Sequence, residues 1–233
     1  MREAQPTTKT DRLNELPGQE VGSEYALPSD TDAEAVAETI WNAFKRADGS
    51  YRIADSLITI GASDTRHIRY ATKDGKKLFV INIRERDGFI TVKKKGKKIE
   101  KNGVLFREEQ EEPFTAGEWN EESEQRIIAE EAERQGIRPE DIVRAEDTEK
   151  RKLKVRLAHF ATGRIYSVGI STKVRSDGTR DVSLSIDYVG KELTEGVTAG
   201  AENPEEEIVR DIRYLREYIG RIVELGHEIP SHP

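Results

Sequence analysis

Three segments between residues 152 and 190 alternate apolar and polar side chains without a break. The first, KLKVRLAHF, directs its leucines and valine to one face and Lys152, Lys154 and Arg156 to the other, because successive side chains of a strand point to opposite faces. In RIYSVGISTKVR the same rule puts Ser171 and Lys173 on the polar face, and DVSLSIDYVG alternates likewise. Such alternation is typical of an antiparallel sheet with one buried face and one wet face.

Further strand patterns occupy the first half of the chain, in RIADSLITIG, RHIRYATK, KKLFVINIRER and FITVKKK. The separators KDGK and RDGF contain Asp-Gly, a pair that tolerates the positive φ of two-residue hairpin turns. We expect another hairpin tip at Gly96, within KKKGKK. These signals predict a β-meander.

Three segments carry helix signals. A capping-box pattern, Thr31 to Glu34, predicts the start of the first helix, and Gly136 predicts the end of a second that spans residues 121–135. Asn203 followed by Pro204 predicts the start of the last helix, whose isoleucines and leucine recur at helical spacing. That apolar stripe favours packing on the chain's own sheet, with a dimerising helix as the alternative.

Together these patterns predict an α+β fold built from two helix-plus-antiparallel-sheet modules. Residues 1–30 are polar and aperiodic and are expected to form a flexible arm. Residues 31–112 would form the first module, a helix followed by the meander. Residues 113–233 would form the second, in α-β-β-β-α order, with the boundary in the acidic segment REEQEEPFTAGEWN.

The order of elements in the second module resembles that of double-stranded-RNA-binding domains, which grip phosphates largely with helices and a strand-joining loop. Here the last helix opens with NPEEE where those domains would show a lysine cluster. The resemblance therefore implies a shared order of elements and not membership, and it transfers no function.

Charge is segregated along the chain, although the net charge is only -7. Residues 66–107 carry +10 and residues 150–180 carry +8, whereas residues 108–149, between them, carry -12. The basic blocks coincide with predicted strands and the acidic block mainly with helix. Two interpretations follow: basic strands and acidic helices attract each other, or the strands expose a positive face to phosphate groups.

Signatures of catalysis and cofactor binding are missing from the sequence. It has no cysteine, no glycine-rich phosphate or dinucleotide loop, and no histidines at metal-ligand spacing, so we expect neither cofactor nor metal. Asp64, Asp74 and Lys76 loosely match a nuclease pattern, but Asp74 falls in a predicted turn. Strands with cations on one face could also close into a phosphate-lined tunnel. That design also needs alternating glutamates to hold a metal ion, and none are identified here, which argues against it.

The sequence thus favours a non-catalytic, soluble and cytoplasmic protein without a membrane segment, which binds a nucleic-acid backbone through its basic strands. The alternative is protein–protein interaction or assembly, with the polar arm and a helix over residues 204–225 as the contact surfaces. Few aromatic side chains accompany the cations, so we expect backbone contact and not base readout. The candidate contact residues are Lys93, Lys94, Lys95, Lys97, Lys98, Lys152, Lys154, Arg156, Ser171 and Lys173.

Overall fold

A computed structural model describes residues 12–45, 49–54, 60–84, 88–115, 117–192 and 203–224. The helices are α1 (Ala33–Lys45), α2 (Glu121–Gln135) and α3 (Pro204–Glu224), with a short 3-10 helix at Pro139–Asp141. The strands are β1 (Arg12–Leu13), β2 (Gln19–Leu27), β3 (Tyr51–Ile53), β4 (Gly61–Thr72), β5 (Lys77–Arg84), β6 (Phe89–Lys95), β7 (Ile99–Lys101), β8 (Val104–Phe114), β9 (Ile142–His159), β10 (Arg164–Val174) and β11 (Arg180–Glu192). The expectation of an α+β fold is confirmed.

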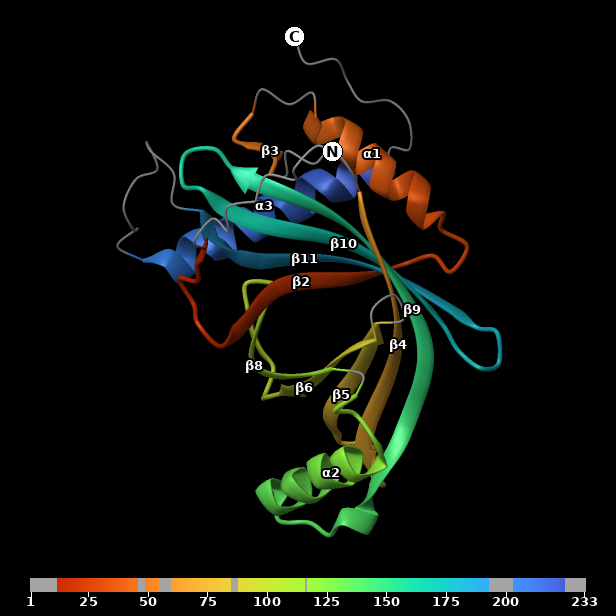
Figure 1. Ribbon diagram of the computed structural model, residues 1–233. Coiled ribbons are helices and arrows are strands. Elements are labelled where there is room, and N and C mark those ends of the chain that lie inside the picture. Colours follow the sequence, from red (N-terminus) through yellow and green to blue (C-terminus); the bar gives the residue numbers. More distant parts are fainter. Residues whose placement is uncertain are drawn as a thin grey trace, which may run out of the picture.

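All the described strands join one sheet, and eight of them close into an antiparallel barrel. Their order around the barrel is β2, β8, β6, β5, β4, β9, β10 and β11, and closure comes from the pairing of β11 with β2. The short strands β1, β3 and β7 extend the barrel by pairing with β11, β9 and β8. Figure 1 shows α1 and α3 over β10 and β11, and α2 at the opposite end of the molecule.

The apolar face of β9, β10 and β11 points outward, toward α1 and α3. Val155, Val168 and Leu184 on the strands share one core cluster with Ile40 of α1 and Ile212 of α3, and all five side chains are buried. Full burial of an aliphatic side chain contributes roughly 1.5–3 kcal/mol. The polar side chains on the alternate positions therefore point into the barrel.

A second core cluster lies under α2. Ile127 and Ala132 of this helix pack against Phe79 and Ile81 of β5 and Val92 of β6. The helix begins and ends where expected, with a capping box between Asn120 and Ser123 at its start and Gly136 in the left-handed conformation at its end. The outward positions of both barrel halves are thus covered by helices, which leaves the polar interior as the shared space.

Two parts of the predicted domain organisation are wrong. Residues 19–27 of the expected polar arm form β2, which pairs with β8 and β11 and is required for closure. The expected boundary at residue 112 falls inside β8, and β4 of the first module pairs along its length with β9 of the second. The order α2-β9-β10-β11-α3 is present, but its strands complete a barrel shared with the first half.

The stripe on α3 is covered by the chain itself. Ile208, Ile212, Leu215 and Ile219 are fully buried in the core cluster, so this stripe cannot serve as the surface for self-association. Within the described ranges, no helix is long and apolar enough to span a membrane.

Two local predictions also need correction. Gly96 is not a hairpin tip, because β6 pairs with β8 and the turn lies at Asn102–Gly103, where both φ angles are positive. The start of α1 is capped by Asp32, whose Oδ1 accepts from Ala35 N at 3.0 Å. Thr31 precedes the cap.

Candidate active site

The barrel interior is lined by side chains whose directions follow from the strand register. Ser171 of β10 lies opposite Lys152 of β9, and Lys173 lies opposite Lys150. Directly paired residues share a face of the sheet, and on these strands the other face is the buried one. Lys154 and Arg156 continue the same inner row on β9.

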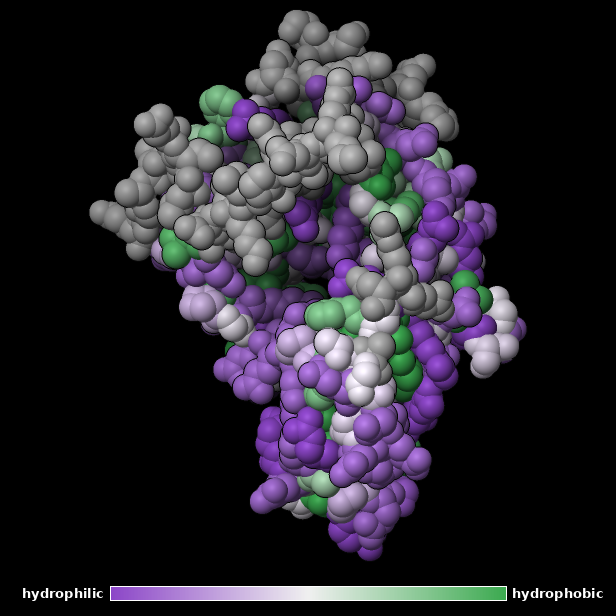
Figure 2. Space-filling model, viewed as in Figure 1, coloured by the Kyte–Doolittle hydropathy of each residue, from purple (hydrophilic) through white to green (hydrophobic). Residues whose placement is uncertain are grey.

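A cavity of about 540 Å³ occupies this interior. That volume lies within the range of small-molecule sites. Eight lysine or arginine side chains line it, against three carboxylates. They are Arg69, Lys77, Lys95, Lys98, Arg107, Lys150, Lys152 and Lys173, with Glu20, Glu24 and Asp187. The cavity is therefore enclosed and strongly positive, while the outer surface on the face seen in Figure 2 is mainly hydrophilic.

Three of the inward-facing lysines have no described ion-pair partner. Across the described part of the chain, no carboxylate forms an ion pair with the ammonium groups of Lys150, Lys154 or Lys173. Burial, followed by the charges of Lys152 and Lys173, lowers the pKa of Lys150 to about 8. Burial and the neighbouring Lys152 and Arg156 also lower the pKa of Lys154. Crowded, desolvated cations without counter-charges favour an anionic ligand.

On the opposite wall the cations are paired. Lys95 Nζ lies 2.7 Å from Glu20 Oε2 and 3.0 Å from Glu109 Oε2, and Lys93 Nζ pairs with both Glu109 and Glu111. Burial acts to raise the pKa of Glu109, but Glu111, Lys95 and Lys93 outweigh it and lower that pKa. One wall of the barrel thus presents paired charges, and the other carries Lys150, Lys154 and Lys173 without a described ion pair.

Glu109 and Glu111 alternate on the inner face of β8, opposite Lys95 and Lys93 of β6. The expectation that no glutamates alternate, which argued against a tunnel, is therefore wrong. The intervening Glu108, Gln110 and Glu112 are also polar, so the segment REEQEEPF shows no hydrophobic period and reads as a loop. Alternating glutamates in a segment without a hydrophobic period were the one signal in the sequence that could have identified β8 as a strand with an ionic inner face.

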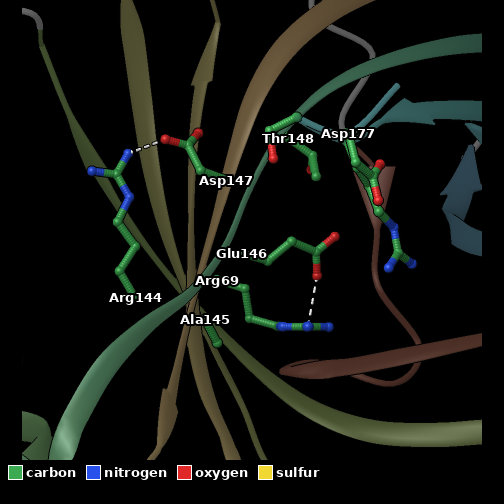
Figure 3. A pocket seen from close by; sticks show the side chains of 9 residues that line it. Arg69, Arg144, Ala145, Glu146, Asp147, Thr148 and Asp177 are labelled. Atoms are coloured by element: carbon green, nitrogen blue, oxygen red, sulfur yellow. Dashed lines mark hydrogen bonds and ion pairs between the residues drawn. The ribbon is translucent and has the colours of Figure 1, made fainter. Parts of the chain in front are cut away.

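A second pocket of about 560 Å³ adjoins the cavity, since Arg69 lines both. Figure 3 shows Arg69 paired with Glu146 and Arg144 paired with Asp147 in this pocket. The pocket is lined by Arg69, Arg144, Ala145, Glu146, Asp147, Thr148, Arg175, Ser176 and Asp177. Its three arginines are balanced by three carboxylates, whereas cations outnumber carboxylates in the cavity.

Seven of the ten candidate contact residues occupy inward-facing positions on the barrel strands. Lys94 instead points outward to Glu130 of α2, at 3.5 Å, and Lys97 and Lys98 are exposed beyond the end of β6, although Lys98 also lines the cavity. The seven that face the barrel interior are Lys93, Lys95, Lys152, Lys154, Arg156, Ser171 and Lys173. Sequence reasoning missed Lys150, Arg69 and Arg107, because nothing local indicates that their strands meet.

The nuclease pattern is not assembled. Asp74 lies in the exposed turn between β4 and β5, and Asp64 alternates with inward-facing Ser63 and Thr65 and so points out of the barrel. Burial lowers the pKa of His67 to about 4, so this inward-facing residue is neutral at pH 7, and its Nδ1 donates to Asn82 Oδ1, 2.9 Å away. In the part of the chain that the structure covers, no three His, Asp or Glu side chains are grouped to hold a metal ion.

No known protein family and no curated protein sequence matches the chain. Among solved structures it is similar to HpAC1 from Hippeastrum, a candidate adenylyl cyclase described as having a dominant triphosphatase activity. The TM-score is 0.51 at 11% identity, over 92% of this chain and 100% of that one. It is also similar to the RNA triphosphatase Pct1 of S. pombe, with a TM-score of 0.40 at 9% identity, over 88% of this chain and 84% of that one.

These comparisons correct the functional interpretation. The basic strands were expected to present an open face to a nucleic-acid backbone, and the rival expectation was a protein-binding or assembly role. Both non-catalytic interpretations are wrong: the cations line the interior of a barrel and do not form an open face, and HpAC1, which shares this fold, is described as having a dominant triphosphatase activity. At 11% identity the similarity to HpAC1 shows a shared fold.

Proposed function

We propose that this protein binds a triphosphate inside the barrel and hydrolyses one of its phosphoanhydride bonds. The proposal depends on one observation: Lys150 and Lys173 line the cavity inside the barrel, and no described carboxylate forms an ion pair with either ammonium group. The fold shared with a protein described as a triphosphatase supports it. Inorganic tripolyphosphate is the smallest substrate of this class.

The chemistry asked of the site is largely electrostatic. Water attacks a terminal phosphorus, the bridging P–O bond breaks, and tripolyphosphate and water give diphosphate, orthophosphate and a proton. Positioning and neutralisation of the phosphoryl oxygens supply most of the catalysis in such reactions. Lys150 and Lys173 on one wall would bind those oxygens, and burial in the barrel strengthens each contact because the effective dielectric constant is lower there than in bulk water.

Many phosphoryl transfers also use a divalent cation. Here Glu20, Glu109 and Glu111 are already held by Lys93 and Lys95, and the described residues form no ready metal site. The proposed hydrolysis therefore assigns no role to a bound metal ion. Assays should include magnesium, manganese and EDTA in parallel.

The test combines binding with phosphate release. Wild-type protein is titrated with tripolyphosphate by calorimetry, and orthophosphate release is measured from tripolyphosphate, ATP and diphosphate. Lys173→Met should weaken tripolyphosphate binding at least about tenfold, since a hydrogen bond to a charged group contributes roughly 1.5–3 kcal/mol. Lys97→Met, at an exposed lysine outside the barrel, is the matched control and should behave as wild type. Absence of both binding and release for every compound would contradict the proposal.

A further inference from the structure

Lys152 does not extend along its own strand but reaches across β10. The inner position of β10 next to it is Gly169, and a Cβ there would lie 2.9 Å from Lys152 Nζ and closer still to Lys152 Cε. The absence of a side chain at Gly169 therefore leaves the path that the lysine occupies. Beyond it, Lys152 Nζ donates to Ser185 Oγ at 3.2 Å and to Asp187 Oδ2 at 3.3 Å, both on β11.

Asp187 is held in turn on its far side. Ser185 Oγ donates to Asp187 Oδ2 at 3.1 Å, and the carboxylate lies over Gly22 of β2, where an added Cβ would be 2.6 Å from Asp187 Oδ1. A line of contacts thus runs across four strands, from Lys152 over Gly169 to Asp187 over Gly22. Gly22 lines the cavity and Gly169 lies on the inner face of β10, and in both places a charged side chain fills the space that a side chain would take.

Lys152 differs in this respect from its neighbours in the inner row. Lys150 and Lys154, two positions away on either side, have no ion pair within the described ranges, whereas Lys152 pairs with Asp187. The ammonium of Lys152 is therefore fixed in place before any ligand arrives.

We propose that Asp187 is a positioning residue, which with Ser185 holds the Lys152 ammonium in the barrel as the pre-set contact for a phosphoryl group. This inference rests on the proposed triphosphate site. Immobilising a lysine side chain on binding costs about 0.5–1.5 kcal/mol, and a lysine held in advance avoids that cost. Asp187 would act through Lys152 and would not itself touch the substrate.

The direction in which Asp187→Asn changes the affinity for tripolyphosphate separates a positioning role from a general effect of charge. Asp187→Asn removes a negative charge from a positive cavity, so charge alone predicts tighter binding of a polyanion. Loss of a positioning contact predicts weaker binding. Glu24 supplies the control: it lines the same cavity on β2 and accepts from Ser183 at 3.0 Å, and no described contact joins it to Lys152.

The experiment is calorimetric titration of full-length wild-type, Asp187→Asn and Glu24→Gln proteins with tripolyphosphate, in EDTA and at one salt concentration. EDTA removes any contribution of a carboxylate through a metal. We expect about tenfold weaker binding for Asp187→Asn, and tighter binding for Glu24→Gln. Tighter binding in both variants would overturn the positioning role.

Gly169→Ala tests the same contact independently. It keeps the charges of Lys152 and Asp187, but its methyl group would occupy the path of the Lys152 side chain and displace the ammonium. It should weaken binding to a similar degree, and the double variant should be no weaker than the weaker single variant, since both act on one contact. Wild-type affinity in Gly169→Ala would also overturn the inference. If wild-type protein fails to bind, the proposed function itself is wrong; if it binds and the variants do not weaken, only the positioning role fails.

Discussion

Lys150 and Lys173 lie directly opposite each other on β9 and β10, two like charges paired on the inner face of the barrel. Like charges at opposed positions of an antiparallel pair are destabilising. The next inward-facing pair on these strands is Lys152 and Ser171. Among the described residues, no carboxylate forms an ion pair with Lys150 or Lys173. The free protein therefore retains an unfavourable arrangement that an anion would relieve.

Replacing one of these lysines should stabilise the free protein. Lys150→Met removes the repulsion and the cost of a desolvated charge, so we expect the free energy of unfolding to rise by about 1–2 kcal/mol. Urea denaturation in a buffer without phosphate measures it. Lys97→Met, at an exposed position, should change stability by less than about 0.5 kcal/mol. Lower stability of Lys150→Met would show that the lysine has a favourable partner.

The stabilisation by a bound polyanion should depend on pH. Burial and the neighbouring lysines lower the pKa of Lys150 to about 8 from its ordinary 10.5. Between these values the unfolded chain holds a proton that the folded chain has lost, so this group makes the free protein more stable as pH rises from 8 to 10.5. Binding needs the charged ammonium and weakens over the same interval. The increase in melting temperature caused by tripolyphosphate should therefore shrink from pH 7 to pH 9.

The same titration with Lys150→Met is the control for that result. Its stability should lose the part of the pH dependence that Lys150 supplies. An increase in melting temperature that is as large at pH 9 as at pH 7 in the wild-type protein would contradict the prediction.

Gly22 should not tolerate a methyl group. A Cβ at this position would lie 2.6 Å from Asp187 Oδ1 and 2.7 Å from the Ile186 carbonyl oxygen, and the backbone oxygen cannot easily move. We expect Gly22→Ala to destabilise the fold by about 1–3 kcal/mol, as overpacking does. Gly61→Ala on β4 is the control, because the nearest atom to its Cβ would be 3.8 Å away. Equal melting temperatures for the two variants would refute this prediction.

A buried ionic cluster near the start of α3 should be among the most sensitive sites. The Arg164 side chain is 1% exposed, and its guanidinium lies 2.7 Å from Glu15 Oε2 and 2.5 Å from Glu207 Oε2. Arg164→Met removes the buried guanidinium from both carboxylates and leaves Glu15 with only the hydroxyl of Tyr188 as a described hydrogen-bond donor, so it should cost about 3–5 kcal/mol. The exposed pair of Arg175 and Asp181 is the matched control, with an expected loss below about 1 kcal/mol for Arg175→Met. Urea denaturation of both variants measures the difference.

Local patterns were enough to predict many of the elements. The alternation of KLKVRLAHF and the two strands after it correctly placed Lys152, Lys154 and Ser171 on one polar face. Gly136 and Pro204 correctly marked one helix end and one helix start. These features depend on neighbours a few residues apart, where side-chain periodicity and backbone preferences act directly.

Two of the eight barrel strands were not predicted, because their sequences carry no apolar period. In β2 (Gln19–Leu27) glycine and serine interrupt the pattern, and in β8 the inner and outer faces are both largely polar. Such strands are stabilised by pairing with their neighbours and not by a buried stripe of their own. Their membership of the sheet is therefore decided by contacts that are distant in sequence.

The sequence by itself determined that this chain has long two-faced strands, three helices to cover their apolar side, and cations on the other side. Only the tertiary structure decided whether that polar side faces water or an enclosed space, because the answer depends on one long-range pairing, β2 with β11. Alternation specifies two faces of a strand and carries no information on which way the sheet curves or whether its edges meet. Closure converts a basic sheet surface into an enclosed positive cavity, and with it an open binding face into a candidate active site.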